Sequence, residues 1–301
     1  MTMTAASFFS ACIVPDPRAR WSSTPQAERD AAYDSNAAVA DSAALIQKRN
    51  AGSAAFRQTR SGSLDIPYGP RPRNRWDLYP AKDPKAPCLV FIHGGYWQRN
   101  SREDFAMYAQ GLLAHGWSVA LPGYSLAPDV TLTDIVAEIH SALDWLQSEG
   151  PRHGIAGPVI LSGWSAGAQL AAMALAHPLV VAGLAISGVY ELEALRDVWV
   201  NKPLQLTDRE IETLSPTRLP VVIKPMTVAY GSAELPTLIN DSRLLHAVRA
   251  AAHAPGALLP ITGAHHFNIL DHLADPDGEL TAAALNLVRQ APAQADRGRA
   301  A

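Results

Sequence analysis

The sequence predicts an α/β protein with a doubly wound, mostly parallel sheet and a small helical insertion over the carboxyl ends of the strands. Three observations predict this fold. Short apolar runs alternate along the chain with segments of helical composition. A Gly-x-Ser-x-Gly turn joins one apolar run to an alanine-rich segment, over residues 159–176. Chemically unusual residues follow four of the predicted strands, at the end where sheets of this kind bind ligands.

The predicted strands begin with a hairpin at a sheet edge, residues 64–66 and 76–79, around a turn rich in proline and glycine. The later strands are continuous apolar runs, which are typical of parallel strands covered on both faces. They are 87–93, 117–121, 159–161, 181–187, 227–230 and 257–261.

The predicted helices have recognisable ends. Ser101 is a plausible N-cap and Gly116 a stop, and Thr131 with Asp134 forms a capping pattern. The helical segments are 101–115, 131–148, 168–176, 192–198, 208–214, 238–252 and 280–289.

These elements give a single domain over residues 26–290. We expect residues 1–25 and 291–301 to be disordered, because they show no periodicity. Residues 26–57 are alanine-rich and predict one or two helices packed on the main body, where they could cover a cleft. The segment 190–225 breaks the strand–helix alternation and predicts a lid-like insertion over the top of the sheet.

Charge, cysteine content and hydropathy indicate which partners and which cellular location to expect. The formal net charge of −3 shows no basic excess, so we expect neither nucleic acid nor a membrane as a partner. The two cysteines, Cys12 and Cys88, form no disulfide framework, and Cys88 lies in a predicted buried strand. Residues 5–14 are too short to span a bilayer and follow no basic segment. We expect a soluble, cytoplasmic protein.

The Gly-x-Ser-x-Gly turn predicts a nucleophile. Gly163 and Gly167 flank Ser165, and a side chain at either glycine would collide with a neighbouring strand or helix. The turn would expose the Ser165 hydroxyl at the carboxyl end of the sheet. It would also leave the Ala166 N–H at a helix start, where an oxyanion could form.

A serine nucleophile needs a base, and the base needs an acid to orient it. Ser165, Glu234 and His266 follow predicted strands in the chain order serine, acid, histidine, which is the order of the α/β-hydrolases. We therefore predict these three residues as a catalytic triad.

Three other residues compete for these roles. His265 is adjacent to His266, and only one of two neighbouring loop residues can reach the serine. Asp241 and Asp271 could replace Glu234, although Asp241 falls inside a predicted helix and Asp271 follows the histidine.

The His93-Gly94-Gly95 turn ends a predicted strand and supplies a second group of backbone donors. We predict an oxyanion hole made by the N–H groups of Gly95, Tyr96 and Ala166, with Gly94 as the near alternative. His93 itself is expected to hold the loop by a hydrogen bond.

Trp97 and Trp164 place aromatic surface beside the serine and are predicted to contact a flat substrate. Motifs for other chemistries are missing from the sequence: it has no His-Glu-x-x-His, no Cys-x-x-Cys pair and no phosphate-binding glycine loop. We expect no metal and no cofactor.

Together these motifs resemble the kynurenine formamidase (arylformamidase) branch of the α/β-hydrolases, which is related to the hormone-sensitive-lipase-type esterases. The resemblance extends from about residue 28 to residue 287. It is carried by His93-Gly-Gly-Tyr-Trp97, Gly163-Trp-Ser-Ala-Gly167 and His266-Phe267, with Asp65-Ile-Pro-Tyr-Gly-Pro70 and Gly123-Tyr-Ser-Leu-Ala-Pro128 in support.

The resemblance implies an α/β-hydrolase fold with Ser165 as the nucleophile and His266 as the base. Where the family carries an aspartate, Gly231-Ser-Ala-Glu234 places a glutamate. It also implies hydrolysis of N-formyl-L-kynurenine to kynurenine and formate, without metal or cofactor. The alternatives are a general carboxylesterase or arylesterase and, more remotely, a non-catalytic ligand-binding protein. The expected partner is a small aryl amide or ester, and the oligomeric state stays open, a homodimer included.

Overall fold

A computed structural model describes Trp21 and residues 23–290. The predicted tail 291–301, Cys12 and most of the predicted disordered segment 1–25 lie outside the described residues. Trp21 belongs to that segment, but its ring packs edge-on against Tyr33 with 5.9 Å between ring centroids. Contacts with the body of the protein therefore begin before residue 26.

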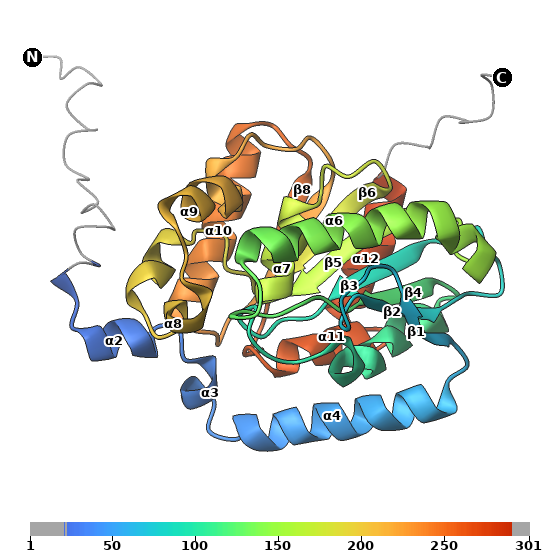
Figure 1. Ribbon diagram of the computed structural model, residues 1–301, viewed down its shortest axis with the longest axis horizontal. Coiled ribbons are helices and arrows are strands. Elements are labelled where there is room, and N and C mark those ends of the chain that lie inside the picture. The colour runs from blue at the N-terminus through green and yellow to red at the C-terminus, as the bar shows by residue number, and fades with distance from the viewer. Residues whose placement is uncertain (1–20, 22, 291–301) are drawn as a thin grey trace, which may run out of the picture.

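The core of the fold is one eight-stranded sheet with the order β1-β2-β4-β3-β5-β6-β7-β8 (Figure 1). Strands β1 and β2 form the predicted edge hairpin, and β2 pairs antiparallel with β4; the other pairs are parallel. The predicted α/β-hydrolase sheet is confirmed. The strands are β1 Ser63–Pro67, β2 Arg75–Tyr79, β3 Cys88–Ile92, β4 Ser118–Pro122, β5 Val159–Trp164, β6 Val180–Ile186, β7 Met226–Gly231 and β8 Gly256–Ile261.

Helices cover both faces of this sheet. On one face α6 Leu132–Glu149, α7 Ala166–Met173 and α10 Pro236–Ala251 share one apolar core with the inward side chains of the strands. On the other face α5 Gln110–Ala114, α11 Asp271–Ala274 and α12 Glu279–Gln290 bury a second core. The central strands are enclosed from both sides, which explains their continuous apolar runs. Cys88 is buried in β3 with a free thiol, as predicted.

Both predicted N-terminal helix caps are present, but the cap at Ser101 begins a 3₁₀ helix and not one continuous helix over residues 101–115. Thr131 and Asp134 form a capping box at the start of α6. Ser101 and Asp104 form another, yet the helix that follows, η2 Arg102–Ala109, is a 3₁₀ helix that precedes α5. Gly116 ends this segment with a φ of +73°. Two more short 3₁₀ helices are η3 Gly150–His153 and η6 Asn268–Leu270.

The insertion between β6 and β7 lies at one end of the sheet, where Figure 1 shows α8 and α9 beside α10. It holds the two predicted helical pieces and two shorter ones that the sequence pattern missed. They are η4 Glu193–Asp197, α8 Asn201–Leu204, α9 Asp208–Leu214 and η5 Pro216–Arg218.

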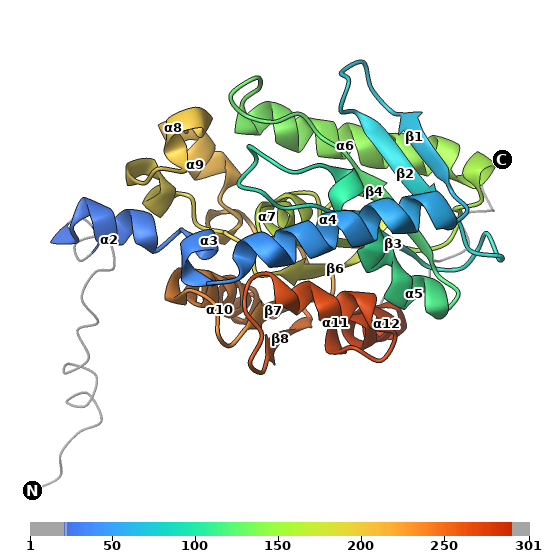
Figure 2. The same cartoon turned by 90° about the horizontal axis from the view of Figure 1, so that it is seen from below.

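The N-terminal segment forms three helices instead of one or two: α2 Gln26–Ala31, α3 Ser35–Ala38 and α4 Ser42–Thr59. Figure 2 shows α4 running across the body of the protein. It packs against η2, where the Ser53 hydroxyl donates a 2.8 Å hydrogen bond to the Asp104 carbonyl. Across the described part of the chain, no helix has both the length and the apolar content that a membrane crossing requires.

A buried carboxylate joins α4 to the edge hairpin. Asp77 of β2 has 0% of its surface exposed and accepts hydrogen bonds from the side chains of Arg57 (2.8 Å) and Arg102 (3.1 Å). Asp65 of β1 also contacts both arginines, but 57% of its side chain is exposed. The network ties α4, η2 and the hairpin together.

Replacing Asp77 with Asn should lower the free energy of unfolding by about 3 kcal/mol, because it removes the fully buried carboxylate and leaves the buried Arg102 guanidinium only the more exposed Asp65 and Glu103 as acidic partners. Asp65→Asn is the matched control: it touches the same arginines from an exposed position and should cost less than about 1 kcal/mol. Urea denaturation of the two variants measures the difference. Equal losses would contradict this assignment of the stability to the buried carboxylate.

Candidate active site

Ser165 stands on a strained corner between β5 and α7, with φ 57° and ψ −121°. Residues with side chains rarely adopt this conformation, which packed surroundings must enforce. A Cβ atom at Gly163 would lie 2.1 Å from the Gly167 carbonyl oxygen, and one at Gly167 would lie 2.1 Å from the carbonyl oxygen of Ile92. The predicted collisions are confirmed: only glycines let strand, turn and helix approach this closely.

Ser165 lines a cavity of about 210 Å³ at the carboxyl ends of the strands. His266, Trp164, Gly95 and Tyr96 line the same cavity, so the structure brings together most of the predicted site residues.

The predicted acid and base meet behind this cavity. Glu234 follows β7 and His266 follows β8, and Glu234 Oε1 lies 3.3 Å from His266 Nδ1. Both side chains are buried. No hydrogen bond joins the Ser165 hydroxyl to the His266 ring among the described residues; contacts of this kind often tighten only when substrate binds. The histidine therefore lies on the same cavity as the serine and has the acid hydrogen-bonded to its other side, which is the order predicted for the triad.

Trp164 supports the histidine. Its indole N–H donates a 3.0 Å hydrogen bond to the His266 carbonyl, and the two ring centroids are 4.5 Å apart. Trp164 thus both lines the cavity and fixes the loop that carries His266.

The competing residues are engaged elsewhere. His265 Nδ1 accepts hydrogen bonds from the backbone N–H groups of Phe267 (3.2 Å) and Asn268 (3.3 Å), so its ring shapes the loop. Asp241 accepts a 2.7 Å hydrogen bond from the Tyr190 N–H, and burial raises the pKa of Asp241 to about 7. Asp271 begins α11. None of these three residues is among those that line the cavity beside Ser165.

Unpaired backbone donors border the cavity beside the serine. Within the described chain the N–H groups of Gly95, Tyr96 and Ala166 donate to no protein acceptor. Gly95 and Tyr96 have φ angles of 124° and 53° and line the cavity, whereas Gly94 does not. A Cβ atom at Gly94 would lie 2.9 Å from that of Ser165, so this glycine lets the turn pass the nucleophile. The geometry suits the predicted oxyanion hole.

His93 has the structural position that its sequence context predicts. Its Nδ1 lies 2.9 Å from the Gly94 carbonyl oxygen, and its ring stacks on Tyr124 with 4.3 Å between centroids. Burial lowers the pKa of His93 to about 3, so the ring is neutral at pH 7.

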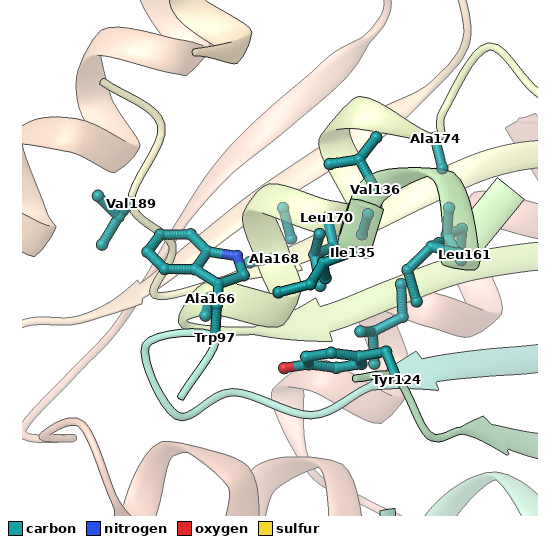
Figure 3. Packing of buried hydrophobic residues seen from close by; sticks show 14 of the residues in the cluster. Trp97, Tyr124, Ile135, Val136, Leu161, Ala166, Ala168, Leu170, Ala174 and Val189 are labelled. Carbon is teal, nitrogen blue, oxygen red and sulfur yellow. The ribbon is translucent and has the colours of Figure 1, made fainter. Parts of the chain in front are cut away.

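Trp97 does not contact the cavity, which corrects its predicted role in binding substrate. Its ring is 0% exposed and is packed toward α7, near Ala166, Ala168 and Val189 (Figure 3). The indole N–H donates a 3.1 Å hydrogen bond to Gln169 of α7. The left-handed backbone of the turn, with φ 59° at Trp97, directs this side chain into the core.

The N-terminal helices provide a wall that the motifs did not reveal. Ser35, Asn36, Ile46 and Arg49, from α3 and α4, line the cavity, together with Arg99 and Asn100 from the turn after β3 and Phe267 from the loop after β8. The insertion 190–225 contributes no residue to this lining among the described residues, although it was predicted to cover the site. Only the alanine-rich composition of residues 26–57 hinted at a cover.

Across Trp21 and residues 23–290, no three histidine, cysteine, aspartate or glutamate side chains are grouped so that they could bind a metal ion.

Comparison with known proteins shows what this chain is similar to. A family model described as BD-FAE matches residues 76–178. Kynurenine formamidase from Danio rerio is 27% identical over 262 residues, which are 81% of this chain and 88% of the relative. A probable isoprenylcysteine alpha-carbonyl methylesterase from Oryza sativa subsp. japonica is 26% identical over 69% of this chain and 58% of its own. A proposed thioesterase from Silicibacter sp. TM1040, a solved structure, superposes with a TM-score of 0.76 at 28% identity, covering 85% of this chain and 98% of that one.

Proposed function

We propose that this chain, a kynurenine formamidase-like α/β-hydrolase related to the esterases, hydrolyses N-formyl-L-kynurenine to L-kynurenine and formate. One observation carries the proposal: Ser165 and His266 line a single cavity, with Glu234 hydrogen-bonded behind the histidine. The similarity to kynurenine formamidase over most of both chains supports the aryl formamide among the substrates such a site could attack.

The proposed reaction uses each residue in turn. Ser165 attacks the formyl carbon while His266 accepts its proton, and Glu234 stabilises the imidazolium that forms. The N–H groups of Gly95, Tyr96 and Ala166 hold the oxyanion. His266 then donates the proton to the amine nitrogen as the C–N bond breaks, which releases kynurenine and leaves a formyl ester on Ser165.

Water completes the cycle. His266 takes a proton from a water molecule that attacks the formyl ester, and formate departs as the serine hydroxyl is restored. An arylamine leaves more readily than an alkylamine, so a serine triad without a metal suffices for this bond. Trp164 and Phe267 supply apolar wall that suits an aryl ring.

The test compares kcat/KM for N-formyl-L-kynurenine with kcat/KM for 4-nitrophenyl acetate and butyrate. We expect the formamide to be the better substrate by at least about tenfold, since interactions with its amino-acid chain add to those with the acyl group. Turnover of the esters alone would replace the formamidase with the second candidate, a general esterase, which the similarity to the isoprenylcysteine methylesterase favours.

A further inference from the structure

The cavity beside Ser165 has a cationic wall. Arg49 of α4 and Arg99 of the turn after β3 both line it, and no aspartate or glutamate of the described residues does. Enclosing a positive charge is costly unless a negative group compensates it. The described residues that line the cavity therefore include no carboxylate that could neutralise a buried arginine.

Arg49 is the buried one of the two, with 6% of its surface exposed. Its Nε and Nη2 donate to the side-chain oxygen of Asn50 (3.0 and 2.9 Å), and Nη2 also donates to that of Asn100 (3.4 Å). Both acceptors are neutral amides, and the guanidinium lies 4.2 Å from the centroid of the Phe105 ring. Within the described chain, Nη1 donates to no acceptor and no carboxylate lies within 4.0 Å of Arg49.

The carboxylate of Asp104 attracts the charge of Arg49 electrostatically, but this carboxylate is hydrogen-bonded to Ser101 and forms no ion pair with Arg49. Asp104 Oδ2 accepts hydrogen bonds from the backbone N–H (2.8 Å) and the hydroxyl (3.0 Å) of Ser101, where it caps η2. Burial lowers the pKa of Arg49 from its ordinary value, as expected for a charge enclosed without an acid beside it.

Arg99 extends the positive charge to the solvent-exposed end of the wall. Its guanidinium lies 5.7 Å from the centroid of the Tyr96 ring and 5.8 Å from that of the Trp199 ring. It too forms no ion pair with a carboxylate in the described part of the chain. Two aromatic rings hold it in place without neutralising it.

We propose that Arg49 binds a carboxylate of the substrate, with Arg99 adding positive charge at the exposed end, so that the site selects aryl substrates that carry a carboxylate over those that lack one. A guanidinium matches a carboxylate in charge and in paired hydrogen bonds. This inference rests on the proposed function in one respect: it assumes that Ser165 attacks the acyl group of the bound substrate. A substrate would place its acyl group at Ser165 and its carboxylate against α4, across one cavity.

A binding experiment tests the inference without any turnover. Two probes share a formanilide group and differ only in charge: 3-(4-formamidophenyl)propanoate and 3-(4-formamidophenyl)propanamide. Calorimetry measures their Kd for the Ser165→Ala protein. We expect the propanoate to bind at least about 30-fold more tightly, since a buried charge pair typically contributes this much.

Variants of α4 assign the preference to one side chain. Adding Arg49→Met should remove most of the preference, and Arg49→Lys should leave an intermediate value, because lysine keeps the charge but loses the paired donors. Lys48→Met is the matched control: it removes the same charge from the neighbouring, exposed position, which does not line the cavity. It should keep the preference within about threefold, because an exposed charge is screened by solvent.

The ratio of the two Kd values is measured within each variant, so a general loss of folded protein does not imitate the expected result. The inference is overturned if neither probe binds, if both bind equally, or if Arg49→Met weakens both to the same extent. Failure of the wild-type protein to hydrolyse N-formyl-L-kynurenine, with the charge preference intact, would reject the proposed reaction and leave the anion site standing.

Discussion

Ser165→Ala should lower kcat by about 10⁴- to 10⁶-fold on both the formamide and the esters, with KM changed by only a few-fold. The variant loses the attacking atom, while the backbone donors and the cavity wall that bind substrate remain. Alanine also removes only the hydroxyl, so the packing of the corner between β5 and α7 is retained. Initial rates with both substrate classes, at saturating and subsaturating concentrations, separate the effect on kcat from the effect on KM.

Ser162→Ala provides a matched control for this variant. Ser162 lies three residues earlier in β5, is buried, and its hydroxyl has no hydrogen-bond partner among the described residues. Its removal should leave kcat within a few-fold of wild type. A fluorophosphonate should label the wild-type protein and the Ser162→Ala variant but not Ser165→Ala. Substantial turnover by Ser165→Ala, or absence of labelling in the wild type, would reject the nucleophile and favour a protein that only binds its ligand.

Glu234→Gln should lower kcat by about 10⁴-fold, the effect expected when the acid of a triad becomes an amide. Glu234 Oε1 lies 3.3 Å from His266 Nδ1, and Oε2 has no hydrogen-bond partner within the described chain. We therefore expect the buried carboxylate to act chiefly on the histidine, by selecting its tautomer and stabilising the imidazolium. Glutamine has nearly the same shape but carries no charge, so KM should change little.

Asp241→Asn and Asp271→Asn are the comparisons that decide which acid serves. Asp271→Asn should leave kcat within a few-fold, because this residue lies at the start of α11. Asp241→Asn changes a hydrogen bond to the Tyr190 N–H, so its thermal stability should be measured beside its activity. The assignment of Glu234 fails if Glu234→Gln keeps a tenth of wild-type kcat while a stably folded Asp241→Asn loses the activity.

Local sequence determines most of the fold and the position of the nucleophile. Apolar runs enclosed from both faces read as parallel strands, and the capping box of Thr131 and Asp134 marks the start of α6. Gly163 and Gly167 specify the corner at Ser165, because only glycine avoids collisions of about 2.1 Å with the neighbouring backbone. The motifs themselves cover only a few positions, so they can be read along the chain, although the collision at Gly167 is with Ile92 of the neighbouring strand β3.

The partners of that nucleophile depend on contacts between distant segments. Glu234 and His266 are 32 residues apart, and the loop contacts of His265 decide which of two adjacent histidines faces the acid. Chain order identified these candidates, but it could not show which way a loop side chain points. Trp97, whose aromatic ring resembled a substrate contact, is buried against α7 by the turn's left-handed backbone.

The cavity wall was decided by tertiary structure alone. Arg49 is one arginine in an alanine-rich helix and stands in no motif; it reaches the site because α4 packs across η2, more than fifty residues later in the chain. The insertion 190–225, which looked like the cover, packs beside α10 and adds no lining residue among those described, although its Trp199 ring lies against Tyr96 and Arg99 of the wall. Which helix closes a cavity depends on side-chain packing and buried ion pairs such as those of Asp77, and these form only when the whole chain is folded.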